Sequence, residues 1–384
     1  MAEIGSAAYA WQLRQELAAR NREWARGRRH VESLGGDPVI VYGPEEGLHG
    51  NFFDPAYAAI LARPEWAKRF NKVHAQGRAL PRPAYDHTRK WRELDSCMSS
   101  DALLMNVFCT PGVAESAAVR RMLGVASSRI NARSEAPCNQ GTTLVVPQAA
   151  ENNPGALAPA SSVLGKRVGG EPLLQPAQAW DEAPVFGWKA RVPLKSGLFD
   201  RTEVDMRWGE LLVEAKLTEL DFQERKAEIV EAYRDFEEVF EAEELPRVEA
   251  VTARRRHATE FAEEFTQEWE ETGAVSADEA GAIAGEFHAG LVAQAEALAP
   301  REMRYRGYQL IRNVLAAHAQ GASFCLIHDA RRPDLREAWF RVLRAVRSAE
   351  MRTRLKVLTW QELAAVLPGH LQAFLEAKYG IVAA

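Results

Sequence analysis

The stretch Glu203–Glu219, EVDMRWGELLVEAKLTE, carries charged side chains in and beside a run that is otherwise typical of a buried strand. The three charges that stand out are Asp205, Glu214 and Lys216. Charged side chains are rarely buried unless another group pairs with them. The stretch therefore predicts two neighbouring strands and a site at which these charges meet.

The spacing of the residues predicts how the charges meet. Along a strand over Leu211–Lys216, successive side chains point to opposite faces, so Glu214 and Lys216 share one face. The preceding sequence RWGE contains Gly209 and is typical of a hairpin turn. A hairpin at this point would bring Asp205, from the preceding strand, back beside Glu214.

Two carboxylates at that separation repel each other unless a cation lies between them. A hard divalent ion with oxygen ligands, Mg²⁺ or Mn²⁺, fits such a pair. A lysine beside the pair can orient or deprotonate a water molecule, or stabilise charge on a phosphate under in-line attack. The residues thus point to metal-assisted chemistry on a phosphate ester.

The order Asp205, then Glu214-Ala215-Lys216 after a glycine turn, resembles the signature of the PD-(D/E)XK nuclease superfamily. The sequences SSDALLMNVF, LTELDF, YQLIRNVLAA and HDARRPDL are similar in style to a bacterial branch of it. The resemblance covers about half of the chain. It implies an α/β fold with a restriction-endonuclease-like core, a small mixed β-sheet flanked by helices, and additional helical regions. It also implies that Asp205 and Glu214 bind the metal ion and that Lys216 assists the attacking water.

The sequence departs from the superfamily pattern at one position and leaves two others open. Val204 stands where the superfamily name implies a proline. Many members also place a glutamate on an early helix, for which Glu115 and, less well, Asp101 are candidates without a fixed spacing. Gln309 resembles a polar position that some members place near the site, although a glutamine on a helix is more often simply exposed or capping.

The composition of the chain changes along its length and indicates three parts. Residues 1–146 are expected to be mostly helical and to pack on, or contribute to, the nuclease core. Residues 147–184 are rich in Pro, Ala and Gly and are expected to form a linker or an insertion. Residues 185–384 are expected to form the core, with a helical insertion at about 252–298.

Several elements are expected from periodicity and from end signals. In the core we expect a long charged helix at Phe222–Glu241, a helix at Tyr305–Gly321 and a buried strand at Ser323–His328. A last strand is expected over LKVLTW. The helices expected in the N-terminal region cover residues 7–31, 55–70 and 99–109.

Charge is unevenly distributed in a chain whose net charge is −5. The segment Glu219–Glu244 contains eleven acidic and three basic residues, and the segment Arg331–Lys356 contains nine basic and three acidic residues. The second segment is expected to be a basic helix with Arg341, Arg344 and Arg347 on one face. That face is either an ordinary solvated surface or a contact for the phosphate backbone of nucleic acid.

The overall composition excludes several classes of protein. Among the 384 residues, 47% are hydrophobic and 26% charged, as in ordinary globular proteins, and no apolar run approaches the roughly 20 residues of a membrane span. The N-terminus lacks the features of a secretory signal. The cysteines are widely spaced, which argues against a zinc ribbon or a disulfide framework and fits the reducing cytoplasm. They are Cys97, Cys109, Cys138 and Cys325.

We expect a cytoplasmic, Mg²⁺- or Mn²⁺-dependent nuclease that hydrolyses phosphodiester bonds, in DNA in the first place. Restriction, repair and anti-phage defence are the roles that fit, with nucleic acid as partner, no membrane, and a homodimer or a partner protein as further options. One alternative is a catalytically inactive protein of the same fold that binds DNA or serves as an assembly subunit, although such a protein has no need of an intact acid–acid–lysine set. The other alternative is a structural helical protein with an accidental motif.

Overall fold

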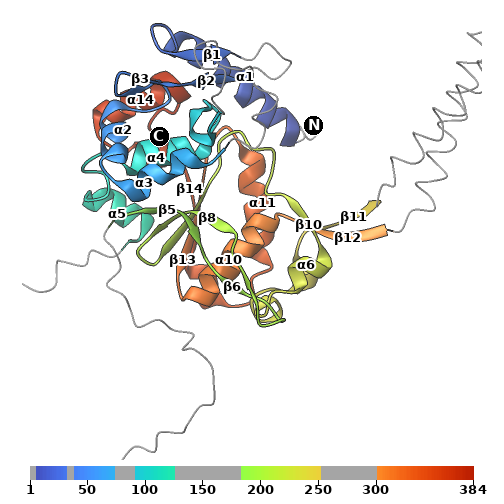
Figure 1. Ribbon diagram of the computed structural model, residues 1–384. Helices are drawn as coiled ribbons and strands as arrows, with labels where there is room; N and C mark the ends of the chain where they lie inside the picture. Colours follow the sequence, from blue (N-terminus) through green and yellow to red (C-terminus); the bar gives the residue numbers. More distant parts are fainter. Residues whose placement is uncertain (1–5, 33–38, 74–90, 126–182, 252–300) are drawn as a thin grey trace, which may run out of the picture.

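The computed structural model describes residues 6–32, 39–73, 91–125, 183–251 and 301–384 (Figure 1). Residues 147–182 of the expected linker, and the whole of the expected helical insertion at 252–298, lie outside the described residues. The division of the chain into three parts therefore stays a prediction.

A five-stranded mixed sheet forms the centre of the fold, with strand order β14–β13–β9–β8–β5. Strand β13 runs parallel to both of its neighbours, whereas β8 runs antiparallel to both of its own, so the central strand β9 has one parallel and one antiparallel neighbour. The fold is thus α/β with a mixed central sheet. The strands are β5 (Val185–Lys189), β8 (Glu203–Trp208), β9 (Leu211–Ala215), β13 (Ser323–His328) and β14 (Leu355–Thr359).

The sequences of these strands match their places in the sheet. Strand β9 is buried along its whole length and β13 along all but its first residue, as is typical of parallel strands covered on both faces. Strand β8 alternates between half-buried and buried side chains. The strands expected at 323–328 and 355–360 are both present.

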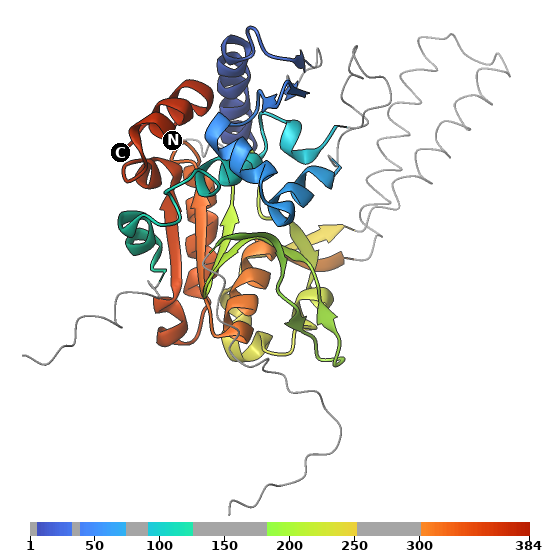
Figure 2. The same ribbon diagram turned by 60° about the vertical axis from the view of Figure 1, so that its left-hand side comes forward.

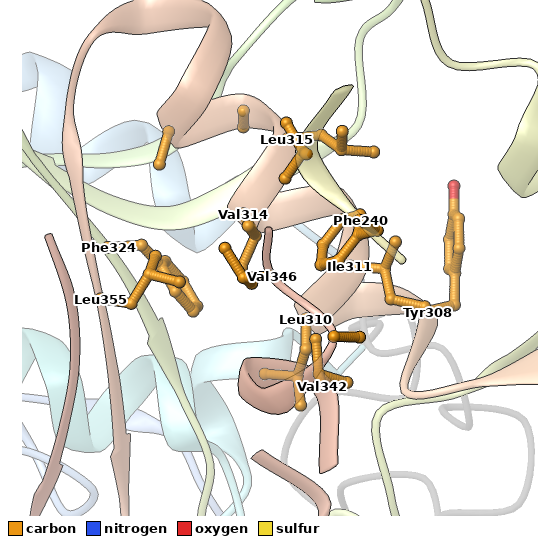
Figure 3. Packing of buried hydrophobic residues seen from close by; sticks show 14 of the residues in the cluster. Phe240, Tyr308, Leu310, Ile311, Val314, Leu315, Phe324, Val342, Val346 and Leu355 are labelled. Carbon is orange, nitrogen blue, oxygen red and sulfur yellow. The ribbon is translucent and has the colours of Figure 1, made fainter. Parts of the chain in front are cut away.

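Helices α10 (Tyr308–Gln320) and α11 (Pro333–Arg344) cover one face of the sheet. Figure 3 shows Val314 of α10 near Phe324 of β13, and Val342 of α11 beside Leu310 of α10. Fully burying an aliphatic or aromatic side chain of this kind contributes about 1.5–3 kcal/mol to folding. This face of the sheet therefore holds a large share of the core.

Helices from both ends of the chain cover the other face. They are α1 (Ser6–Trp24), α4 (Ser100–Phe108), α13 (Trp360–Ala364) and α14 (Gly369–Tyr379). Helices α1 and α14 lie side by side at one end of the sheet (Figures 1 and 2). The Asn21 amide joins them by donating to the Lys378 carbonyl at 3.1 Å. Residues far apart in the sequence thus share one hydrophobic cluster.

Shorter elements surround these layers. The helices are α2 (Asp54–Leu61), α3 (Pro64–Ala67), η1 (Lys68–Asn71), η2 (Glu93–Asp95), α5 (Ala117–Leu123), α6 (Ala227–Glu231), α7 (Phe236–Val239), η3 (Ala242–Glu244) and α12 (Ala349–Thr353). A second sheet has the strand order β10–β12–β11 and consists of β10 (Glu224–Lys226), β11 (Arg247–Val251) and β12 (Arg301–Arg306). Three small antiparallel pairs remain, formed by β1 (His30–Glu32) with β2 (Ile40–Tyr42), β3 (Pro44–Glu45) with β4 (Leu48–His49), and β6 (Val192–Pro193) with β7 (Phe199–Asp200).

The prediction of a long helix at Phe222–Glu241 is wrong. This segment forms strand β10 and the two short helices α6 and α7. Between the two helices its backbone bonds to another part of the chain, because the Arg234 N–H donates to the Pro193 carbonyl and the Lys195 N–H to the Ala232 carbonyl. Tertiary hydrogen bonds therefore override the helical propensity of the segment.

Other expected helices are shorter than the sequence indicated. The basic segment 331–356 holds α11, α12 and the start of β14 instead of one helix. Helix α10 begins only at Tyr308, because Gly307, with a φ of 75°, separates it from β12. In the part of the chain that the structure describes, no helix is long and apolar enough to cross a membrane.

Candidate active site

The β8–β9 hairpin turns at Gly209, whose φ of 58° lies in the left-handed region that favours glycine. Trp208 pairs with Leu211 across the turn. Toward the other end of the hairpin, the half-buried Asp205 accepts a hydrogen bond from the Ala215 backbone N–H at 2.8 Å. The predicted hairpin is therefore confirmed, and it carries Asp205 to the end of β9.

Glu214 and Lys216 form an ion pair inside the protein, with 2.9 Å between Oε1 and Nζ. Their exposed fractions are only 2% and 5%. The other oxygen of Glu214 accepts a hydrogen bond from Asn313 Nδ2 at 2.7 Å. Arg312 Nη2 donates to Asn313 Oδ1 at 2.8 Å, which directs the amide NH₂ toward Glu214. Both carboxylate oxygens of Glu214 are thus held in place.

The electrostatics of this region follow from burial and from the excess of acids. Burial raises the pKa of Asp205 well above its ordinary value, and the charges of Glu214 and Asp101 raise it further. Burial alone would lower the pKa of Lys216, but the nearby carboxylates, Glu214 first, outweigh it and raise that pKa. The region therefore has surplus negative charge, and its lysine stays protonated at neutral pH.

Helix α4 brings a third acid to this place. Asp101, in its first turn, is 7% exposed, and its charge acts on Asp205. Arg69 forms an ion pair with Asp101, and Lys72 Nζ lies 3.4 Å from the same carboxylate. Glu115, the candidate ranked above Asp101 from sequence, is instead exposed in the turn before α5. We call Asp101, Asp205, Glu214 and Lys216 the acid–lysine cluster.

Gln309 lies beside the acid–lysine cluster. It precedes Asn313 by one turn of α10 and so shares a face of that helix with it. Its backbone N–H donates to the Phe222 carbonyl at 3.0 Å, and the Lys216 Nζ lies 5.7 Å from the centre of the Phe222 ring. Among the described residues, no hydrogen-bond partner reaches its buried Oε1. Gln309 therefore offers an unused acceptor next to the cluster.

Over residues 18–135 and 163–380, the chain matches the family described as Restriction Endonuclease associating with ARP. These residues make up well over half of the chain. The chain belongs to this family. No curated protein and no solved structure matches the chain.

The match to this restriction endonuclease family includes the acid–lysine cluster. Both its helix α4 and its β8–β9 hairpin fall within the matched residues, and so does Asn313 on α10. The charged residues that meet in the structure thus belong to the part of the chain by which the family is recognised.

The chemistry of the cluster fits a hard divalent cation. Asp205 and Glu214 offer carboxylate oxygens in a region with surplus negative charge, and Mg²⁺ is commonly bound by one or two carboxylates together with water. Within the described ranges, no group of three or more His, Cys, Asp or Glu side chains is arranged to hold a metal ion. The protein would therefore supply these two carboxylates, and water or substrate the other ligands.

Sequence reasoning left out Asn313 and Arg312, which position Glu214. The available signal was weak, since the two residues form a polar pair inside the otherwise apolar helix sequence YQLIRNVLAA. Both are buried, with exposed fractions of 0% and 3%. A buried polar pair needs partners, and the partner of Asn313 lies on a strand about a hundred residues earlier.

The arginines expected on the basic helix have more ordinary surroundings. Arg341 forms an ion pair with Glu337, and Arg347 forms one with Glu241 at 2.9 Å. Arg344 is exposed. Since two of the three are already paired with acids, this face gives only limited support to a phosphate contact.

The described cysteines are buried and form no disulfide. They are Cys97, Cys109 and Cys325, and Cys138 lies outside the described residues.

Proposed function

We propose that this chain is a metal-dependent nuclease of the PD-(D/E)XK type, with a restriction-endonuclease-like core, that hydrolyses phosphodiester bonds in DNA. The observation that carries the proposal is that Asp205, Glu214 and Lys216 lie together on one hairpin, where Asp205 bonds to the Ala215 N–H, Glu214 pairs with Lys216, and the charge of Glu214 acts on Asp205. Membership in the family described as Restriction Endonuclease associating with ARP supports the proposal. We also retain the division into a helical region at 1–146, a linker at 147–184 and the core at 185–384.

Asp205 and Glu214 are the residues that would hold Mg²⁺ or Mn²⁺. When bound, such an ion polarises the phosphate and lowers the pKa of a bound water. Asn313 keeps Glu214 oriented for this task through the 2.7 Å hydrogen bond to Oε2. The surplus negative charge around Asp205 gives the site its preference for a cation.

Lys216 serves as a positive charge near the phosphate. Because the neighbouring carboxylates keep it protonated, it cannot accept a proton from the attacking water at neutral pH. It can instead stabilise the negative charge that develops on the phosphate oxygens in the transition state. This role differs from that of a general base, and the lysine needs no change of protonation to fulfil it.

The family description adds a protein partner to this proposal. It names an association with ARP, and we propose that the chain acts together with such a partner on nucleic acid, in restriction, repair or defence. A catalytically inactive DNA-binding subunit is the competing function, and the test below separates the two.

The test is incubation of plasmid and linear DNA with the protein in Mg²⁺, in Mn²⁺ and in chelator. The wild type is expected to cut only with the divalent ion, and Glu214→Ala and Lys216→Ala are expected to lose cleavage. The exposed residues Glu210 and Lys189 provide matched controls, because Glu210→Ala removes an acid from the same hairpin and Lys189→Ala removes a lysine from the edge strand. Both control variants should cut at the wild-type rate.

The same experiment can overturn the proposal. A wild type that never cuts, or a Glu214→Ala variant that cuts at the control rate, would contradict the assignment of the site. A gel shift in Ca²⁺, without any cleavage in Mg²⁺ or Mn²⁺, would favour the inactive DNA-binding subunit.

A further inference from the structure

The segment that follows β9, Lys216 to Leu220, is held in place by side chains from distant parts of the chain. Trp360 Nε1 donates to the Lys216 carbonyl at 3.0 Å, and Arg14 Nε donates to the Thr218 carbonyl at 3.2 Å. Leu217 and Thr218 are buried, with exposed fractions of 0% and 3%. The Lys216 N–H still donates to the Ile327 carbonyl of β13 at 2.8 Å. The Lys216 and Thr218 carbonyls are bonded by the Trp360 and Arg14 side chains instead.

Glu219 connects Leu217 and Ser100, which are the sequence neighbours of Lys216 and Asp101 in the acid–lysine cluster. Its Oε2 accepts a hydrogen bond from the Leu217 N–H at 2.7 Å, directly after Lys216. Its Oε1 accepts a hydrogen bond from the Ser100 hydroxyl, directly before Asp101. One carboxylate thus ties the end of β9 to the start of α4.

Arg332 in turn holds the backbone of Glu219. Its Nη1 donates to the Glu219 carbonyl at 2.7 Å, and its Nη2 donates to the Leu220 carbonyl at 3.0 Å. The side chain is 0% exposed, and Asp334 balances its charge through hydrogen bonds of 2.9 and 2.8 Å. The Ser6 hydroxyl completes this contact, because it lies within hydrogen-bond distance of both the Leu220 carbonyl, at 2.8 Å, and the Asp334 carboxylate, at 2.5 Å.

We propose that Glu219 and Arg332 are positioning residues for the proposed nuclease reaction. Glu219 fixes Lys216 relative to Asp101, and Arg332 fixes Glu219. The inference rests on the proposed function, since it names the residues that set the geometry of the same site. It also assigns a task to the HDARRPDL sequence, which contains Arg332.

The proposal makes Arg332 act through Glu219, and this can be separated from a general loss of stability. Two residues that act on one geometry lose their effects non-additively, whereas independent sites add. The variants are Glu219→Ala, Arg332→Met and the double variant, with the exposed Glu228→Ala and Arg336→Met as matched controls. Arg332→Lys and Glu219→Gln extend the test if a larger change fails to fold.

The measurement is single-turnover cleavage of saturating duplex DNA in Mg²⁺, together with DNA binding in Ca²⁺. Each single variant is expected to cut about tenfold to a hundredfold more slowly, the usual range for residues that support the groups at a site. DNA binding should stay at the wild-type value, and the double variant should be no slower than the slower single one. Losses that multiply, or variants that cut as fast as the controls, would overturn the inference while leaving the nuclease itself intact.

Hydrogen exchange at the Leu217 amide gives a second measurement that needs no cleavage. The Leu217 N–H donates to Glu219, so its exchange should become faster in Glu219→Ala and Arg332→Met and stay unchanged in both controls. If the wild type cuts no DNA with any divalent ion, the proposed function fails, and this measurement still decides the positioning. Unchanged exchange in both variants would overturn it.

Discussion

Among the residues that the structure describes, two lysines are buried, and their surroundings differ. Lys216 ends the β8–β9 hairpin and forms an ion pair with Glu214, at 2.9 Å. Lys378, on α14, is 0% exposed and donates to Asn21 Oδ1. Its Nζ also lies 4.3 Å from the centre of the Tyr42 ring. The first lysine is surrounded by carboxylates, and the second by an amide and aromatic rings.

The two environments have opposite effects on the charge. Burial lowers the pKa of Lys378 to about 7. The same burial acts on Lys216, but the carboxylates beside it outweigh the burial and raise its pKa. The carboxylates thus keep Lys216 charged beside the acids of the cluster, whereas Lys378 joins α14 to α1 through its hydrogen bond to Asn21.

The largest expected effect is on Glu214. Glu214→Ala removes a proposed metal ligand and leaves the buried Lys216 without its carboxylate partner. We expect cleavage to fall by at least about a thousandfold, equivalent to about 4 kcal/mol in the activation free energy. The measurement is the initial rate of plasmid nicking in Mg²⁺, with Glu210→Ala as the control. If Glu214→Ala and Glu210→Ala nick at equal rates, the surroundings of Lys216 have no more part in the chemistry than those of Lys378.

Removal of each lysine tests the comparison directly. Lys216→Met is expected to slow cleavage by about a hundredfold to a thousandfold, the usual loss when a group that stabilises transition-state charge is deleted. Lys378→Met should cut at the wild-type rate, measured at a temperature at which circular dichroism shows both variants to be folded. A slower cleavage rate in a folded Lys378→Met protein would contradict the expectation that Lys378 serves the fold alone.

The pH dependence of stability is expected to come from Lys378. Its pKa is lower in the folded than in the unfolded state, so above about pH 7 the unfolded chain binds the extra proton and stability rises with pH. Between pH 7 and pH 9.5 the free energy of unfolding of the wild type should rise by about 3 kcal/mol relative to Lys378→Met. Urea denaturation of both proteins at the two pH values measures this difference, and parallel curves would contradict it.

The smallest expected effect concerns the asparagine in each region. Asn313→Ala frees one oxygen of Glu214 and should slow cleavage about tenfold, as is usual when a group that orients a ligand is lost. Asn21→Ala removes the acceptor of Lys378 and should lower the thermal midpoint without changing the cleavage rate of the folded protein. If Asn21→Ala slows cleavage and Asn313→Ala does not, the active site lies in the region of Lys378 and not in that of Lys216.

The sequence predicted the parts of the site that depend on local geometry. Alternation along β9 and the glycine at position 209 were sufficient to place Asp205, Glu214 and Lys216 on one hairpin. Strands β13 and β14 were also predicted, because their apolar runs have the length of a strand and the first follows a glycine that ends a helix.

The rest of the site depends on contacts between distant segments, which local patterns do not record. The position of Asp101 depends on how α4 packs. Asp101, the weaker of the two candidates for the third acid, therefore lies near Asp205, whereas Glu115 is exposed elsewhere. The sequence did not reveal the roles of Asn313 and Arg332, since their partners lie on other elements. The same cause explains the error at Phe222–Glu241, whose backbone bonds to residues 193 and 195.

The hydrogen bonds around the segment after Lys216 have a consequence for synthesis of the protein. Their donors are Arg14, which lies 204 residues before its acceptor, and Arg332 and Trp360, which lie 113 and 144 residues after theirs. A ribosome makes Asp205, Glu214 and Lys216 long before it makes Arg332 and Trp360. A nascent chain, or one truncated before Trp360, therefore carries the charged residues without the supports that arrange them, and the fold delays assembly of the cluster until Trp360 has been made.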